Sequence, residues 1–213
     1  QAAIYAIDSI KAGTNQVVIA GGLESMTNAP QILPSGRKGV RLGHAKIYDH
    51  MFLDGLEDAY TGGPMGGFAQ STADEHGITR EEMDAFAIES LTRAKAAIDS
   101  GKLHAEIAPV TDKTRKGEHQ VTDDEQPHKG NAEKIPSLRP AFAKDGTITA
   151  ANSSSISDGA SALIIAGEAA ITQHNLTPMA RIVAHSRFSR APEEFTLAPV
   201  GAIEALLAKT GWG

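Results

Sequence analysis

The hydrophobic positions at the start of the chain follow two different periods. From 2–12 the isoleucines recur at helical spacing up to Gly13, which predicts a helix with a glycine C-cap. The aliphatic run at 17–20 predicts a short buried strand, and Gly21–Gly22 predicts the turn that ends it. Helix, strand and turn together indicate one unit of a mostly parallel α/β sheet.

The middle of the chain first loses this period and then regains it. Residues 26–58 scatter Pro, Gly, Arg and His, so an irregular excursion is expected there. A long helix should begin after Thr79, because Thr79 and Glu82 can form a capping box, and it should end at Ser100 before Gly101. We expect its apolar stripe to be core, namely Met83, Phe86, Ala87, Leu91, Ala94 and Ile98.

The last part of the chain returns to an alternation of strands and helices. Before it, charges of both signs fill 112–134 and predict exposed loops with short edge strands. The patterns that follow are a buried strand at 162–166, a helix at 168–174, a strand at 181–185 and a helix at 200–207. An insertion therefore interrupts one layered α/β domain, and such interruptions often carry ligand contacts.

Composition and charge narrow the class of protein. The chain has 213 residues, of which 41% are hydrophobic and 22% charged, so it can bury the core of a globular protein. Its net charge of -6 argues against nucleic acid as a partner. With no apolar run of ~20 residues and no signal-peptide pattern, we expect a cytoplasmic protein without a membrane partner. The sequence begins inside a helical pattern and stops just after the helix that Gly211 ends, which indicates a segment of a longer polypeptide.

Cysteine and histidine limit the possible chemistry. The chain contains no cysteine, so disulfides, cysteine-ligated zinc and a thiolate nucleophile are excluded within it. None of the eight histidines shows a paired metal-binding spacing, and no metal site is predicted. His44 and His50 lie in the irregular excursion as surface or interface residues.

The stretch "AANSSSISDGASALIIAG" at 150–167 places a polar, conformationally loose loop directly before an aliphatic strand. Small side chains let backbone and hydroxyl groups approach a ligand, so this loop is the strongest candidate for ligand contact. The alternative is a solvated turn, because Ser and Asn favour turns in any protein.

Two separated motifs carry a resemblance to a known family. "VVIAGGLESMTNAP" at 17–30 and "NSSSISDGASALII" at 152–165 resemble segments of the thiolase family. The intervening stretches "DGLEDAYTGGPMG", "TREEMDAFAIES" and "LRPAFAKDGTITAANSS" are similar to thiolase segments in the same order. The resemblance covers essentially the whole chain, and the branches most similar to it are acetyl-CoA acetyltransferases and 3-ketoacyl-CoA thiolases.

The resemblance implies a layered α/β fold of βαβαβαββ halves, incomplete here, with an inserted α+β loop domain that holds coenzyme A. It assigns 1–26 and 156–177 to the N-terminal domain, 27–155 to the loop domain, and 178–213 to the start of the C-terminal domain. It further implies a homodimer or homotetramer and a place in fatty acid metabolism.

The resemblance also implies where coenzyme A binds, as a substrate rather than as a tightly held cofactor. The matching positions are Ser154 as a hydrogen-bond partner of the pantetheine, Ala150 in its tunnel, Leu56 and Met65 around the acyl and pantetheine tunnel, Phe142 near the adenine, and His128 as the basic residue at the nucleotide. Leu56, Met65 and Phe142 could equally be ordinary core residues. Pro64 stands where family members often have histidine.

Thiolase chemistry needs a cysteine thiolate with proton-transfer groups beside it. By resemblance, the nucleophilic cysteine would precede Gln1, while the histidine and the second cysteine would follow Gly213. The whole protein is thus expected to be an acyltransferase, and the 213-residue chain alone to be inactive. The alternative is a non-catalytic relative that binds acyl-CoA.

Overall fold

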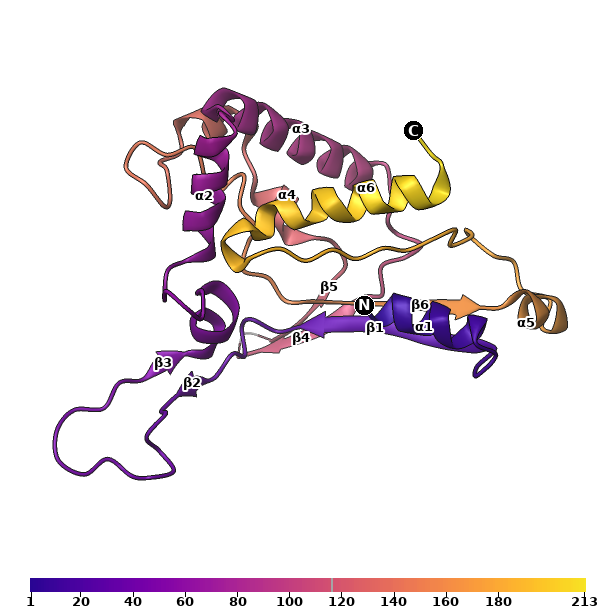
Figure 1. Cartoon of the computed structure of the whole chain (residues 1–213), viewed down its shortest axis with the longest axis horizontal. Coiled ribbons are helices and arrows are strands. Elements are labelled where there is room, and N and C mark those ends of the chain that lie inside the picture. The colour runs from indigo at the N-terminus through magenta and orange to yellow at the C-terminus, as the bar shows by residue number, and fades with distance from the viewer. Residues whose placement is uncertain (116) are drawn as a thin grey trace. The chain divides into compact units, whose positions relative to one another are not determined.

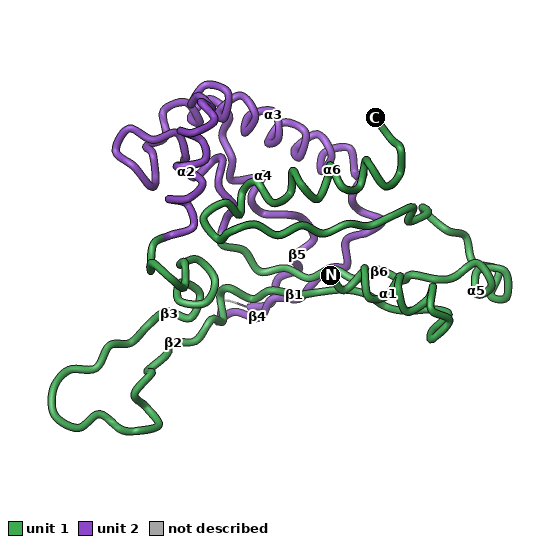
Figure 2. The backbone as a smooth tube through the Cα atoms, in the orientation of Figure 1, with its two compact units in different colours: residues 1–63, 156–213 green, residues 64–155 purple. Residues whose placement is uncertain are grey.

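The computed structural model describes residues 1–115 and 117–213, in six α-helices, six strands and three short helices of other types (Figure 1). Lys116, in the charged run, lies outside the described residues. The described chain divides into two compact units, shown in Figure 2. Unit 1 joins Gln1–Gly63 to Ile156–Gly213, and unit 2 is Pro64–Ser155.

Unit 1 begins with the predicted helix and strand. Helix α1 (Ala2–Lys11) ends where expected, since Gly13 has a φ of +73°, and it buries Ala6 and Ile7. Strand β1 (Val17–Glu24) lies beside β6 (Gly159–Ala166) in an antiparallel ladder (Figure 1).

The expected parallel unit and the burial of these two strands are wrong. The β1–β6 sheet has two strands in the described chain, and α1 packs against it. Ala20 is buried, but Ile19 is 74% exposed and Ile164 is 72% exposed. An aliphatic run predicts that a segment is a strand, yet it contains no information on strand direction or on how many neighbours cover it.

The glycine turn expected after residue 20 is also wrong, because Gly21 and Gly22 lie inside β1. Gly21 pairs with Ala162, and a Cβ atom placed on it would lie 2.4 Å from the carbonyl oxygen of Ser161. The glycine is therefore required by the close approach of the two backbones and not by a turn.

The irregular excursion is confirmed. It contains only short elements in unit 1: β2 (Gln31–Ile32) pairs with β3 (Tyr48–Asp49), and a π-helix, η1 (Phe52–Leu56), follows. Residues 36–48 between and along these strands are exposed.

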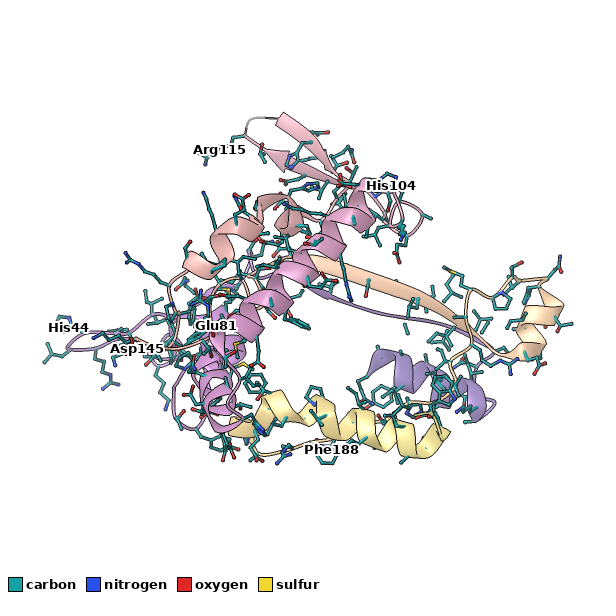
Figure 3. The ribbon with its side chains drawn as sticks, turned by 90° about the horizontal axis from the view of Figure 1, so that it is seen from above. His44, Glu81, His104, Arg115, Asp145 and Phe188 are labelled. Atoms are coloured by element: carbon teal, nitrogen blue, oxygen red, sulfur yellow. The ribbon has the colours of Figure 1, made fainter. Side chains whose placement is uncertain are left out.

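The C-terminal part of unit 1 is helical apart from one long extended segment. Helices α5 (Glu168–Gln173) and α6 (Ala198–Thr210) match the predictions, with η3 (Pro192–Leu197) before α6. The strand expected at 181–185 is wrong, because these residues pair with no strand in the described chain. Phe188 instead packs on α6, where a Cβ atom on Gly201 would lie 2.6 Å from its ring (Figure 3).

Asp158 ties together two stretches of unit 1 that are distant in sequence. Its Oδ1 accepts a hydrogen bond from the Thr27 N–H at 2.9 Å, and its Oδ2 accepts one from the Ser25 hydroxyl at 3.4 Å. The bond from Thr27, foremost, lowers the pKa of Asp158 below its ordinary value of 3.8. The loop that returns to β6 is thereby fixed to the loop that leaves β1.

The described part of unit 2 contains three α-helices, a β-hairpin and a 3₁₀-helix. Its elements are α2 (Met65–Glu75), α3 (Arg80–Asp99), β4 (Val110–Thr114), β5 (Gly117–Val121), α4 (Glu125–Lys129) and the 3₁₀-helix η2 (Ala132–Ser137). Strands β4 and β5 form an exposed antiparallel hairpin, which confirms the edge strands expected in the charged run.

Helix α3 forms as predicted, and all but one of the residues expected on its inner face are buried or half-buried. Thr79 and Glu82 make the complete capping box, and the helix ends at Ser100. Phe86, expected in the core, is 77% exposed, whereas Asp84 is buried beside Ala87. Only the expected burial of Phe86 is wrong. Asp84 takes an inward position because its carboxylate pairs with Arg80.

The start of α2 is packed against the segment that follows η2. The ring of Phe142 lies on Gly66, where a Cβ atom would come within 2.1 Å of Phe142 Cζ. One turn later the buried Gln70 accepts hydrogen bonds from the backbone N–H groups of Thr147 and Ile148 through its Oε1. These contacts fix residues 142–148 onto α2.

The hydrogen bonds that Asp158 accepts from Ser25 and Thr27, called the Asp158 latch below, lead to a prediction about stability and pH. Replacement of Asp158 by Asn should lower the urea midpoint at neutral pH, because the native state favours the ionised carboxylate. A lowered pKa contributes stability above 3.8 that is lost as the pH falls through the native-state value, so the difference from wild type should shrink on acidification. Asp145→Asn, at an exposed position shown in Figure 3, is the control, and an equal effect of the two variants at every pH would contradict the latch.

The Phe142–Gly66 contact predicts opposite effects for two adjacent glycines of α2. Gly66→Ala should lower the free energy of unfolding by about 1–3 kcal/mol through overpacking against Phe142. Gly67→Ala meets nothing within 4 Å and should raise it by up to about 1 kcal/mol, since alanine favours the helix. Urea unfolding of the two variants measures this, and Gly66→Ala as stable as Gly67→Ala would refute the packing.

Candidate functional site

A cavity of about 560 Å³ in unit 2 is the candidate ligand site. Helix α3 supplies one wall through Ala87, Leu91 and Ala94, while α4, η2 and the serine loop at 150–155 supply the others. A more open depression in unit 1, lined by residues 22–24 and 157–161, lies along the ends of the β1–β6 ladder and offers no such enclosure.

The floor of the cavity lies between α3 and α4, where side chains of α3 contact the backbone at Gly130. Lys95 donates a hydrogen bond from Nζ to the carbonyl oxygen of Gly130 at 2.8 Å. A Cβ atom on Gly130 would lie 2.6 Å from Leu91 Cδ1, so the Leu91 side chain packs directly on the Gly130 backbone and would have to shift to admit a larger residue. Gly130 and Leu91 thereby bring α4 and α3 together at the cavity.

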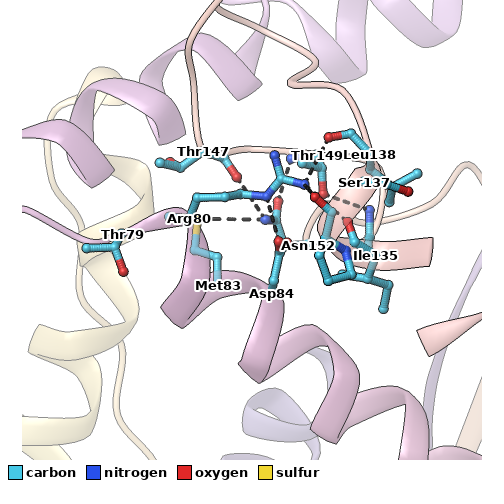
Figure 4. Close-up of polar contacts among 12 residues, drawn as sticks. Thr79, Arg80, Met83, Asp84, Ile135, Ser137, Leu138, Thr147, Thr149 and Asn152 are labelled. Carbon is cyan, nitrogen blue, oxygen red and sulfur yellow. Dashed lines mark hydrogen bonds and ion pairs between the residues drawn. The ribbon is translucent and has the colours of Figure 1, made fainter. Parts of the chain in front are cut away.

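The serine loop is ordered by an asparagine. Asn152 accepts a hydrogen bond from the Thr149 N–H at 2.8 Å through Oδ1, and its Nδ2 donates to the Thr147 carbonyl at 3.0 Å (Figure 4). Thr149 is fully buried, and the Ser153 hydroxyl donates to its carbonyl at 2.8 Å. The first half of the loop is therefore a rigid turn, in contrast to the loose segment its composition indicates.

Some of the charged side chains that line the cavity already have a partner within the described chain, and one does not. Asp124 caps α4 by accepting a hydrogen bond from the Gln126 N–H at 3.2 Å, and Lys129 pairs with Glu125 at 3.0 Å. The ammonium group of Lys134 has no hydrogen-bond or ion-pair partner in the part of the chain that the structure describes. Lys134 is thus the cation that the cavity can offer to an anionic ligand.

Of the predicted site residues, Ala150 lines this cavity. Ser154 is exposed and lies between two lining residues, Ser153 and Ser155, without lining the cavity itself. His128 is exposed on α4. Its neighbours Pro127 and Lys129 line the cavity, and His128 itself does not.

The three apolar candidates lie elsewhere. Met65 begins α2 in unit 2, and Phe142, which is 41% exposed, covers the adjacent Gly66. Leu56 ends η1, in unit 1. None of the three is among the cavity-lining residues.

Three residues of the site were not predicted from the sequence: the cavity residues Lys134 and Gly130, and Asn152, which orders the loop. Lys134 lies in a mixed-charge stretch and has no local feature that distinguishes it from other surface lysines. The available signal was Asn131, which caps η2 by accepting a hydrogen bond from the Glu133 N–H at 3.0 Å, and which indicates a helix start beside the lysine.

The cavity has the chemistry of a binding site. Its lining combines apolar side chains with serine hydroxyls and a free cation, and among the described lining residues there is no histidine to activate a hydroxyl. Within the described chain, no group of three or more His, Cys, Asp or Glu side chains could hold a metal ion. None of the described helices is at once long and apolar enough to span a membrane.

Known proteins resemble this chain over nearly all of its length. The family model described as "Thiolase, N-terminal domain" matches residues 1–169. An acetyl-CoA acetyltransferase of Yarrowia lipolytica is 44% identical over 206 residues, which are 97% of this chain and 51% of that protein. The chain spans about half the length of the curated relatives it matches.

Solved structures agree with the sequence match. An acetyl-CoA acetyltransferase from Bacillus anthracis has a TM-score of 0.93 at 39% identity and covers 100% of this chain, which spans 54% of it. A thiolase from Ascaris suum, solved in complex with coenzyme A, has a TM-score of 0.88 at 37% identity, with 99% of this chain and 53% of that one covered. The resemblance seen in the motifs is confirmed: the chain has an incomplete thiolase-like α/β fold and belongs to the thiolase family.

Proposed function

We propose that this chain is the coenzyme A-binding part of a thiolase that transfers an acyl group to or from coenzyme A, either by acetyl-CoA condensation or by 3-ketoacyl-CoA thiolysis. The observation that carries the proposal is the cavity of unit 2, where the serine loop of the thiolase motif meets α3 and η2. The family match and the acetyl-CoA acetyltransferase relatives support the reaction class.

The cavity suits the chemistry of coenzyme A. Its volume falls in the range of about 300–1,000 Å³ typical of small-molecule sites. Leu91, Ile135 and Leu138 give it apolar walls for the pantetheine arm, and Lys134 can pair with a phosphate. Backbone groups and hydroxyls of the rigid serine loop supply the polar contacts that an amide-containing arm needs.

The structure supports some of the coenzyme A contacts assigned by resemblance more than others. Ala150 lines the cavity, and Ser154 and His128 adjoin residues that do, so small rearrangements would bring them to the ligand. Met65 and Phe142 form the packed start of α2 and are proposed as walls of the pantetheine and adenine ends. Leu56 is proposed as a wall of the acyl tunnel.

We further propose the domain boundaries expected from the sequence, with a loop domain over 27–155 between 1–26 and 156–177, and the start of a C-terminal domain over 178–213. The end of unit 2 at Ser155 supports the boundary after residue 155. In the whole protein we propose a cytoplasmic homodimer or homotetramer acting in fatty acid metabolism.

In the proposed mechanism, the residues of this chain bind and orient the thioester and do not take part in its covalent chemistry. Acyl transfer needs a thiolate nucleophile, groups that move protons, and an oxyanion hole. The chain has no cysteine. From the resemblance to thiolases we propose that the nucleophile precedes Gln1 and that the histidine and second cysteine follow Gly213. A non-catalytic acyl-CoA-binding relative would use the same cavity and would lack cysteine in those flanks.

The binding proposal predicts a measurable role for Lys134. In the full-length protein, Lys134→Ala should raise the dissociation constant for coenzyme A about tenfold, because a charge-assisted contact to phosphate is worth about 1.5 kcal/mol or more. Lys102→Ala, at an exposed lysine outside the cavity, is the matched control and should leave binding unchanged. Isothermal titration calorimetry measures both variants, and wild-type protein that does not bind coenzyme A would refute the proposed function.

The 213-residue chain by itself is predicted to be inactive, because it contains no thiolate nucleophile. The purified chain should cleave acetoacetyl-CoA in the presence of coenzyme A no faster than a heat-denatured sample. Activity above that background would show that the catalytic groups do not lie outside residues 1–213, as proposed.

A further inference from the structure

Arg80, the first residue of α3, joins the helix to the end of η2. Its Nε donates to Asp84 Oδ2 at 2.8 Å, while Nη2 approaches three carbonyl oxygens at once (Figure 4). These belong to Ile135 at 3.1 Å, Pro136 at 3.3 Å and Leu138 at 2.9 Å. The guanidinium group thus occupies the place of a C-terminal cap on η2.

Such a cap matters for this element because η2 is intrinsically weak. It is a 3₁₀-helix of six residues that contains Pro136, and its last carbonyls have few partners within the helix. A cation at a helix C-terminus also interacts favourably with the helix dipole. The position of η2 therefore depends on external contacts, which include the bonds from Arg80 and the burial of Ile135.

Asp84 keeps the guanidinium in place. Its side chain is 8% exposed, and in the described chain its Oδ1 has no hydrogen-bond partner, so Arg80 is what compensates its charge. Arg80 itself is 21% exposed in its side chain and does not line the cavity. Any effect of Arg80 on a ligand must act through the backbone that it holds.

The segment held in this way forms a wall of the cavity. Lys134, Ile135 and Leu138 line it, and Arg80 bonds the carbonyls of two of these residues. A change in the orientation of η2 would therefore move the free cation and two apolar contacts together.

We propose that Arg80 is a positioning residue of the coenzyme A site, which sets the placement of Lys134 and the apolar wall of η2 without touching the ligand. This inference rests on the proposed function of the cavity. Binding groups must be held within a fraction of an ångström of the productive geometry, so loss of the cap should weaken binding although no ligand contact is removed.

The test uses Arg80→Lys in the full-length protein. Lysine retains a positive charge beside Asp84 but cannot bond that carboxylate and three carbonyls in one plane. The dissociation constant for coenzyme A should rise about fivefold to tenfold, and in turnover the KM for coenzyme A should rise while kcat is preserved. Arg93→Lys is the matched control, because Arg93 pairs with Glu89 on the same helix at an exposed site and should change neither quantity.

Two further measurements distinguish the positioning of η2 by Arg80 from a general contribution of Arg80 to stability. Hydrogen exchange of the backbone amides in 132–138 should accelerate in Arg80→Lys, while exchange in β4 and β5 stays as in wild type. If this variant melts at a much lower temperature, the double variant Arg80→Met with Asp84→Leu replaces it, since removal of both buried charges is often tolerated. That variant should fold and still bind coenzyme A more weakly than wild type.

The outcomes are distinct from those that test the function itself. Wild-type protein that binds coenzyme A together with an Arg80→Lys variant of unchanged affinity would overturn this inference and leave the proposed function intact. Weakened affinity with unchanged exchange in 132–138 would likewise overturn it. Wild-type protein without affinity for coenzyme A would remove the proposed function and this inference with it.

Discussion

The interaction on which unit 2 depends most is the attachment of irregular backbone to α3 by charged and polar side chains. Arg80 holds the end of η2, and Lys95 holds Gly130 further along the same helix. Short elements such as η2 and α4 cannot hold their own positions, because they are too brief to be stable alone. A single well-capped helix of 20 residues thus serves as the rigid support for a ligand cavity made largely of loops.

This arrangement has an energetic cost that explains its residue choice. A buried carboxylate such as Asp84 is unfavourable unless it is paired, and the Arg80–Asp84 pair meets that requirement while leaving guanidinium N–H groups free for carbonyls. Lysine has no planar fork and could not serve both partners. The result is a binding wall placed by hydrogen bonds to backbone, which fixes its geometry more sharply than apolar contact alone.

Local features were readable from the sequence, and long-range ones were not. The capping box of Thr79 and Glu82 was predictable because its partners lie three residues apart. The antiparallel pairing of β1 with β6 joins Val17 to Ala166, and no local pattern specifies such a partner. Phe86 shows the same limit, since the inward place of Asp84 depends on Arg80 and on the carbonyls beyond it.

The candidate site likewise contains residues that the sequence predicts and residues that only the structure brings out. Ala150 was found because the serine loop carries a motif, whereas Lys134 and Arg80 are single cations in polar stretches and become significant only when η2 lies against α3. The family membership rests on the family model over residues 1–169 and on relatives that match nearly the whole chain, and the site rests on the cavity.

The most direct test of the central claim is a crystal structure of the full-length protein with coenzyme A bound. We expect the ligand in the unit 2 cavity, with its pantetheine arm along the serine loop and a phosphate within hydrogen-bonding distance of Lys134 Nζ. Coenzyme A bound at a different place, with this cavity occupied only by solvent, would contradict it.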